Sequence, residues 1–317
     1  MSPALLATLA WAVHPLQPVH EKPEAYSEIV TVVADLPGGG VVRLEMSVSN
    51  IGPGDDHGGC RLAVHFPGEQ AWSEEVALDR SQWSFAPGPP ARLVVGPCTI
   101  VAGERVRASA TFASGSIDVT LDAPMAATAP PHHRLDTPGG AFYDERVLVP
   151  WAPVEVDLRR GVEVRRYAGA ATVDHYRVTA LPQEIAHRWV RFRGLSAGRS
   201  VLLEARLPVA REPVAGWIWV EGESAPVPLT SFGLTQQTGS PGGPSAWVAL
   251  GEAGATRFRI TSGPVVRRYA PVEDHGLLTV VLRSVVGNPV SWDFRAVLAL
   301  EGVEPLAGIF EVMLDER

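Results

Sequence analysis

The chain has 317 residues, enough for about two domains of ordinary size. Hydrophobic residues make up 46% and charged residues 20%, which is typical of globular proteins and excludes an intrinsically disordered chain. The net charge is −8 and the isoelectric point is near 5.6, so the chain lacks the basic surface that binding to a nucleic-acid backbone requires. We therefore expect no nucleic-acid partner.

The compartment is judged from the first apolar run and from the cysteines. The run from Ala4 to Val13 is too short to cross a bilayer and lacks the lysine or arginine of a secretory signal. Cys60 and Cys98 could pair if their strands were adjacent, but a chain of this length that relied on disulfides would normally contain more cysteines. We favour free thiols, leave the pairing open, and expect a cytoplasmic protein with no transmembrane segment.

Alternation of apolar and polar residues recurs along most of the chain, whereas helical periodicity is rare after the first dozen residues. Ser27 to Leu36 and Val41 to Asn50 are rich in β-branched residues and flank a Pro-Gly-Gly-Gly segment, which predicts a β-hairpin. The other strands predicted in the first half are Cys60 to Phe66, Glu74 to Leu78, Arg92 to Val95, Arg105 to Phe112 and Ser116 to Leu121.

Residues 123–140 are rich in proline and glycine and show no periodicity, which is typical of a segment between domains. We place a first domain, including this crossover, over 1–140 and a second over 141–317. Alternation resumes at 154–159, and later strands are predicted at His187 to Arg193, Ser200 to Leu207, Gly216 to Glu221, Trp247 to Leu250, Thr256 to Thr261, Leu277 to Val286, Trp292 to Leu300 and Ile309 to Leu314. Roughly fifteen strands favour two closed or nearly closed barrels, which leave few exposed edges.

Asp174 and His175 place a carboxylate beside an imidazole after a strand-like segment. On a regular strand the two side chains point to opposite faces. If the chain bends there, Asp174 could orient His175 or share a proton with it, and burial would raise the carboxyl pKa toward the range of a general acid. The alternative is an Asp-stabilised turn with a surface histidine. The sequence has no phosphate-binding loop before a lysine, no G-x-S-x-G and no H-E-x-x-H motif, which argues against kinases and the common hydrolases.

Two aromatic pairs have the spacing of neighbours on one face of a strand. Trp217 and Trp219 would line an apolar cavity if they faced the inside of a barrel, and their rings could stabilise a developing cation. As simple core filling they need no function. His187 and Trp189 share a face in the same way, and packing explains that pair as readily as a site does.

Several short segments together resemble one known superfamily. They are Tyr26-Ser-Glu-Ile-Val-Thr-Val leading into the hairpin, Ser47-Val-Ser-Asn50 before a Gly-rich loop, Val149-Pro150-Trp151-Ala152-Pro153, Gly169 to His175, Pro182 to Leu195 and Gly308-Ile-Phe-Glu311. This set resembles the hydroxyneurosporene synthase (carotenoid 1,2-hydratase) superfamily, which also contains survival-factor-like proteins and lipocalin-type fungal Diels-Alderases. Its most specific pattern is G-x-G-x-x-D-H-x-W-G. Gly169, Asp174 and His175 match, whereas Arg177 and Val178 replace the tryptophan and the glycine.

The resemblance implies an all-β fold of two lipocalin-like (calycin) antiparallel β-barrels packed side by side, with a hydrophobic pocket in or between them. It implies a cofactor-independent cyclase, isomerase or hydratase that acts on a hydrophobic polyene, isoprenoid or polyketide-like, and needs no metal. A carrier protein that binds a hydrophobic ligand without transforming it is the alternative.

We assign site residues on the same basis. Asp174 and His175 are the expected catalytic residues: either donates a proton to an alkene, or, in a pericyclic version, the pocket only aligns the reacting ends. The expected substrate-binding residues are Tyr167, Tyr176, His187, Trp189, Trp217 and Trp219. The oligomeric state is not predicted.

Overall fold

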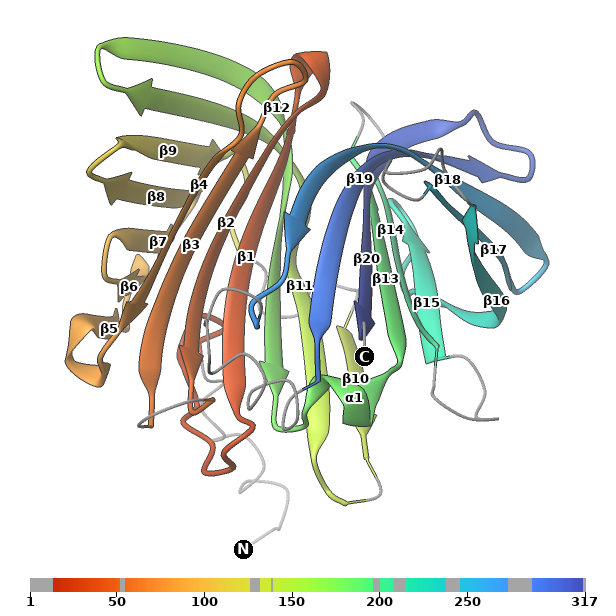
Figure 1. The fold of residues 1–317 in the computed structure, drawn as a ribbon, viewed down its shortest axis with the longest axis horizontal. Coiled ribbons are helices and arrows are strands. Elements are labelled where there is room, and N and C mark those ends of the chain that lie inside the picture. The colour runs from red at the N-terminus through yellow and green to blue at the C-terminus, as the bar shows by residue number, and fades with distance from the viewer. Residues whose placement is uncertain are drawn as a thin grey trace, which may run out of the picture.

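The computed structural model describes residues 14–51, 55–125, 132–137, 139–195, 200–207, 215–237, 246–272 and 287–315. These residues fold almost entirely into antiparallel strands that form two curved sheets lying side by side (Figure 1). The second sheet closes into a barrel, and the first curls until it is nearly closed. The predicted all-β fold of two lipocalin-like barrels is confirmed.

The first sheet holds the N-terminal strands. They are β1 (Ser27–Leu36), β2 (Gly40–Ser49), β3 (His57–His65), β4 (Trp72–Leu78), β5 (Trp83–Ala86), β6 (Ala91–Val95), β7 (Cys98–Ala102), β8 (Val106–Phe112), β9 (Gly115–Leu121), β10 (His132–Asp136), β11 (Phe142–Arg160) and β12 (Glu163–Val178). Their order is β4-β3-β2-β1-β12-β11-β9-β8-β7-β6-β5, and β10 adds to β11. The first strand therefore pairs with the last, and β4 and β5 are the two free edges.

A disulfide joins the two arms of this curled sheet. Cys60 of β3 and Cys98 of β7 are bonded, their Cα atoms are 5.9 Å apart, and both side chains are buried in one core with Leu62 and Ile100. The interpretation of both cysteines as free thiols is wrong. β3 and β7 are far apart in sheet order, and only the curl brings them face to face, so strand adjacency could not reveal the pair.

A short helix precedes the second sheet, which consists of eight strands in sequence order. They are α1 (Pro182–Ile185), β13 (Arg188–Gly194), β14 (Val201–Leu207), β15 (Ala215–Val220), β16 (Val227–Gln237), β17 (Ala246–Ala253), β18 (Thr256–Tyr269), β19 (Pro289–Leu300) and β20 (Leu306–Asp315). β13 pairs with both β14 and β20, which closes the barrel. Inward side chains such as Phe192, Ile260 and Phe310 fill its core. Within the residues that the structure describes, no helix is long and apolar enough to cross a membrane.

Most of the predicted strands are present, including the hairpin of β1 and β2, whose turn places Gly38 and Gly39 at φ of 73° and 83°. The sequence analysis missed β5, β7, β10 and β16, and it described part of β12 as strand-like without assigning a strand there. β5 and β7 have four and five residues, too few for a clear alternation, and β16 is exposed along most of its length. The strand predicted at Leu277 to Val286 lies outside the described residues.

The strand pairing determines where the chain passes from one sheet to the other. β11 and β12 belong to the first sheet, because β11 pairs with β9 and β12 pairs with β1. The passage falls between Val178 and Arg188, whereas the expected boundary was at position 140. The proline-rich segment before it carries β10, which adds to β11 within the same sheet.

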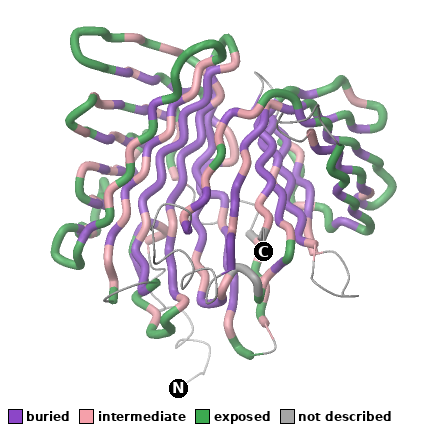
Figure 2. The backbone as a smooth tube through the Cα atoms, viewed as in Figure 1, coloured by how far each residue is buried: buried purple, intermediate pink, exposed green. Residues whose placement is uncertain are grey.

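The two sheets pack against each other through their outer faces. Figure 2 shows the strands in the middle of the molecule buried along most of their length, while the outer hairpins are exposed. Val33 and Val41 of the first sheet form an apolar cluster with Val266 and Ile309 of the barrel. Much of the remaining contact is charged. We call the side chains between the two sheets the interdomain layer.

Candidate functional site

The interdomain layer contains a buried network of charged side chains. Arg43 of β2 donates to both Glu311 carboxylate oxygens at 3.2 Å and to Glu45 at 2.6 Å. Arg193 of β13 donates to Glu311 at 3.3 Å and to Asp174 of β12 at 3.0 and 2.5 Å. All five side chains are buried. Glu311 of the barrel is thus held by one arginine from each sheet.

Removal of Glu311 is expected to destabilise the fold. Glu311→Gln removes the carboxylate that Arg43 and Arg193 share and leaves one excess positive charge buried in the network. The loss of one partner of a buried ion pair typically costs about 3–5 kcal/mol. Guanidinium denaturation measures the loss. The matched control is Glu252→Gln, because Glu252 pairs with Arg257 on the exposed surface and such pairs contribute about 1 kcal/mol or less. Equal losses in the two variants would contradict a structural role for the network.

The same network predicts a loss of stability in acid. Burial alone would raise the pKa of Glu45, but the Arg61 and Arg43 guanidiniums outweigh it and hold that pKa at about 2. Because this value is below that of an unfolded glutamate, the ionised carboxyl stabilises the folded state at neutral pH, and the stabilisation is lost as the pH falls toward 2. Denaturation midpoints measured from pH 6 downward should fall in the wild type, and Glu45→Gln should flatten that dependence. An unchanged slope in the variant would contradict the assignment.

One small cavity opens inside the layer. Its lining residues are the charged Glu145, Asp174, Arg191, Arg193 and Glu204 together with Trp217, Val147, Phe192, Leu202 and Leu203. Its volume is about 10 Å³, close to what a single water molecule occupies. We take this cavity and its walls as the candidate active site.

Strand alternation explains why these side chains meet. On β12, Thr172, Asp174 and Tyr176 point away from the core of the first sheet and into the layer. On β13, Arg191 and Arg193 point away from the barrel core and into the layer, because Phe192 between them faces that core. Two outer faces that would be solvated in a single barrel are thereby buried against each other.

Asp174 is fixed as an ion pair. Besides Arg193, it receives hydrogen bonds from the Tyr176 hydroxyl at 3.0 Å and from the Thr172 hydroxyl at 3.3 Å. Arg193 also donates to the Tyr176 hydroxyl at 2.9 Å. These three partners hold the Asp174 side chain in one position at the edge of the cavity.

Glu145 also lines the cavity, but its environment differs from that of Asp174. Its Oε1 atom is 3.3 Å from Nε of Arg191, which also lies 3.6 Å from Glu204, and its Oε2 atom is buried with no hydrogen-bond partner. Burial raises the pKa of the Glu145 carboxyl and the nearby Asp174 carboxylate adds to the increase, although Arg191 opposes both. The site therefore holds one buried carboxyl group whose pKa is raised beside a second that is paired with an arginine.

Aromatic side chains form the rest of the site. Trp217 and Trp219 lie on the outer face of the barrel, where they pack with Val147 and Leu202, rather than in its interior. Trp219 donates its indole N–H to the Glu223 carbonyl at 3.0 Å, whereas the indole N–H of Trp217 is buried without a partner.

A second aromatic group lies beside Arg191. Tyr143 and Trp189 meet edge to face with ring centroids 4.6 Å apart, and Tyr143 stacks on Tyr176. The Arg191 guanidinium lies over the rings of Tyr176 and Trp189, at 4.2 and 4.5 Å, and donates to the Tyr143 hydroxyl at 2.6 Å.

Five of the eight residues predicted for the site lie in the interdomain layer: Asp174, Tyr176, Trp189, Trp217 and Trp219. The other three lie elsewhere. His175 points to the opposite face of β12, with Nε2 3.4 Å from Glu28; Tyr167 stacks on Phe66; and His187 is exposed.

Sequence reasoning missed Glu145, Arg191, Arg193 and Glu204. Charges that alternate with apolar residues, as in β13 and β14, usually mark the solvated face of a strand. The only usable signal was that two adjacent strands carry such charges at matching positions. Among the residues that the structure describes, no group of three His, Cys, Asp or Glu side chains is arranged as a metal site.

Comparison with known proteins gives structural matches only. No protein-family model and no curated protein matches the sequence. A crystal structure provisionally described as an AttH from Nitrosomonas europaea has a TM-score of 0.62 at 13% identity and covers 92% of this chain and 93% of its own. CghA has a TM-score of 0.58 at 9% identity, with 96% of both chains covered. Kievitone hydratase from Nectria haematococca has a TM-score of 0.56 at 12% identity, with 96% and 93% covered. The chain shares the two-barrel fold of these proteins.

Proposed function

We propose that the protein is a cofactor-independent hydratase that adds water to a carbon–carbon double bond in the interdomain layer. The observation that carries this proposal is the water-sized cavity lined by two carboxyl groups in contrasting environments, Glu145 and Asp174. A buried carboxyl group whose pKa is raised is suited to the role of general acid, and a neighbouring carboxylate can accept the proton that the attacking water loses.

The residues support the following sequence of steps. The protonated Glu145 carboxyl gives its proton to one alkene carbon, which leaves a cation on the other carbon and a carboxylate on Glu145. The Asp174 carboxylate and the aromatic faces of the layer stabilise that cation. Water attacks it through oxygen and loses a proton to Asp174, and exchange with solvent then restores both carboxyl groups. If an internal group of the substrate captures the cation instead, the same protonation leads to cyclisation or isomerisation.

The layer also limits the substrate class. A hydrocarbon with no polar group would leave Glu145 Oε2 and the Trp217 N–H buried without partners, at a cost of about 1–3 kcal/mol each. We therefore expect an amphipathic substrate, with an isoprenoid or polyketide-like arm against Trp217 and Leu202 and a polar group among the carboxylates. Because the cavity is water-sized, such a substrate enters only when the two sheets part locally.

The names of the structural neighbours agree with this class of ligand. One is a hydratase named for kievitone, and CghA has been crystallised with the small molecule Sch210972. At 9–13% identity these proteins share the fold with the present chain, and the reaction is our proposal.

Isotopically labelled water tests the reaction directly. Purified protein is incubated with a panel of alkenes that carry phenol, enol or carboxyl groups, and products are analysed by mass spectrometry. A product that contains oxygen from the labelled water supports hydration, and an isomer of unchanged mass supports cyclisation or isomerisation. A panel returned unchanged, with the substrates recovered bound, would overturn the enzymatic proposal.

The carrier function remains the second candidate, because a further pocket opens at the end of the first sheet. An organic extract of the purified protein separates the two functions. A stoichiometric, chemically unaltered ligand supports carriage, and a hydrated product supports catalysis.

We also propose a cytoplasmic location, but one of the two observations behind that prediction no longer supports it. The prediction depended on the first apolar run and on two free thiols, whereas Cys60 and Cys98 are bonded. Disulfides persist mainly in oxidising compartments, so the cysteines no longer support the cytoplasm.

A further inference from the structure

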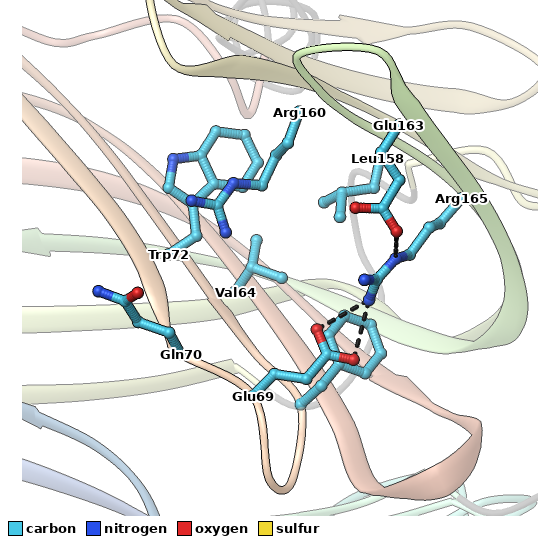
Figure 3. A pocket seen from close by; sticks show the side chains of 9 residues that line it. Val64, Glu69, Gln70, Trp72, Leu158, Arg160, Glu163 and Arg165 are labelled. Carbon is cyan, nitrogen blue, oxygen red and sulfur yellow. Dashed lines mark hydrogen bonds and ion pairs between the residues drawn. The ribbon is translucent and has the colours of Figure 1, made fainter.

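A second pocket lies at the end of the first sheet, where β3 and β11 end and β4 and β12 begin (Figure 3). Its volume is about 190 Å³, far larger than the cavity between the sheets, and the two share no lining residue. A dry cavity of about 150 Å³ is known to hold benzene, so this pocket has room for one ring and a small substituent.

The floor of the pocket is apolar. Val64, Leu158 and Trp72 belong to the core of the first sheet, and Phe66 packs against it. The Trp72 indole N–H is already satisfied, because it donates to Ser114 at 3.0 Å and Glu74 at 3.1 Å. The face of the indole ring is therefore what Trp72 can offer to a ligand.

The rim carries two arginines with different partners. Arg165 donates to Glu69 at 2.8 and 2.9 Å and to Glu163 at 2.5 Å, so its charge is compensated (Figure 3). Arg160 lies on the other side of Val64, with its guanidinium carbon 5.4 Å from the centroid of Trp72. Within the described part of the chain, Arg160 has no carboxylate within the 4.0 Å of an ion pair.

We propose that this pocket binds a small carboxylate whose body is a flat apolar ring. The ring lies on Trp72 and Val64, and the carboxylate pairs with Arg160, whose planar guanidinium can donate two parallel hydrogen bonds. Glu69 and Glu163 remain engaged with Arg165, and Glu74 remains engaged with Ser114. A cationic ring would meet the Arg160 charge above Trp72, and a neutral ring would leave Arg160 unpaired. The site is independent of the proposed hydratase activity.

Calorimetric titration with benzoate, benzyl alcohol and benzylamine tests the proposal. Benzoate is expected to bind in a saturable manner, about tenfold or more tightly than the neutral and cationic compounds. Arg160→Gln is expected to weaken benzoate binding by about tenfold or more. The matched control is Arg159→Gln, which removes the neighbouring exposed arginine on the opposite face of β11 and should leave binding unchanged.

Three outcomes would overturn the proposal: no saturable binding of benzoate, equal binding of benzyl alcohol, or unchanged benzoate affinity in Arg160→Gln. Circular dichroism of both variants checks that the fold is retained, which is expected because both side chains are exposed. Turnover of the proposed hydratase is not part of the readout, so the two proposals succeed or fail separately.

Discussion

Glu145→Gln is expected to lower turnover by about a hundredfold to ten-thousandfold. The amide has nearly the shape of the carboxyl group but cannot give up a proton, and general acids typically contribute factors of this size. Since burial raises the pKa of Glu145, wild-type turnover should also decline as the pH rises through that raised pKa and the carboxyl loses its proton. Turnover measured against pH at saturating substrate checks both expectations.

Two further variants make that result specific. His175→Gln removes the imidazole on the opposite face of β12, which faces Glu28, and should retain near wild-type turnover. Asp174→Asn should lower turnover and shift the alkaline decline to lower pH, because the Asp174 carboxylate contributes to the raised pKa of Glu145. Wild-type turnover in Glu145→Gln, or a large loss in His175→Gln, would refute the assignment of the acid.

Loss of the disulfide is expected to lower the stability of the fold strongly. Cys60 and Cys98 are 38 residues apart, and closing a loop of that length lowers the entropy of the unfolded chain by an amount worth about 4 kcal/mol. The Cys60→Ala/Cys98→Ala variant should therefore unfold at a clearly lower urea concentration than the oxidised wild type. Hydrogen exchange should increase first in β5 to β7, because these strands lie at the free edge that the bond secures.

The alanine variant also removes two buried sulfur atoms, so the reduced wild type is the control for packing. If thiol labelling shows that the bond is broken and the urea midpoint does not change, the disulfide has no stabilising role. If only the alanine variant loses stability, the loss comes from the cavity that alanine leaves.

Most of the strands could be predicted from the sequence, because the alternation of apolar and polar residues is a local signal. β8 and β9 alternate between buried and more exposed residues, whereas β1 and β2 are buried on both faces and are rich in β-branched residues. The predicted limits of all four strands differ from the observed ones by a residue or two at most. The point at which the chain passes from the first sheet to the second could not be predicted. It depends on the pairing of β1 with β12, two strands about 140 residues apart, and no local pattern encodes that contact.

The residues of the candidate site could be predicted only in part, for a related reason. Asp174 was predicted because a motif contains it. Trp189 and Trp217 were predicted because each shares one face of a strand with a second ring. Arg191 was missed because its alternation with apolar neighbours is that of an ordinary outer surface. Glu145 was missed because it lies between Asp144 and Arg146, in a run of charged residues that resembles a solvated segment. Gly169 matches the motif for a backbone reason: a Cβ there would overlap the Asp35 carbonyl oxygen of β1.

The pairing of β1 with β12 also bears on how the molecule is made. During synthesis, β1 and β2 leave the ribosome early, but the neighbour that completes the exposed edge of β1 is not available until residue 178 has emerged. Until then, a ten-residue strand that is mostly apolar remains open to pairing with other nascent chains. Slow translation of the intervening segment should therefore favour aggregation, and chaperones that cover strand edges should raise the yield of folded protein.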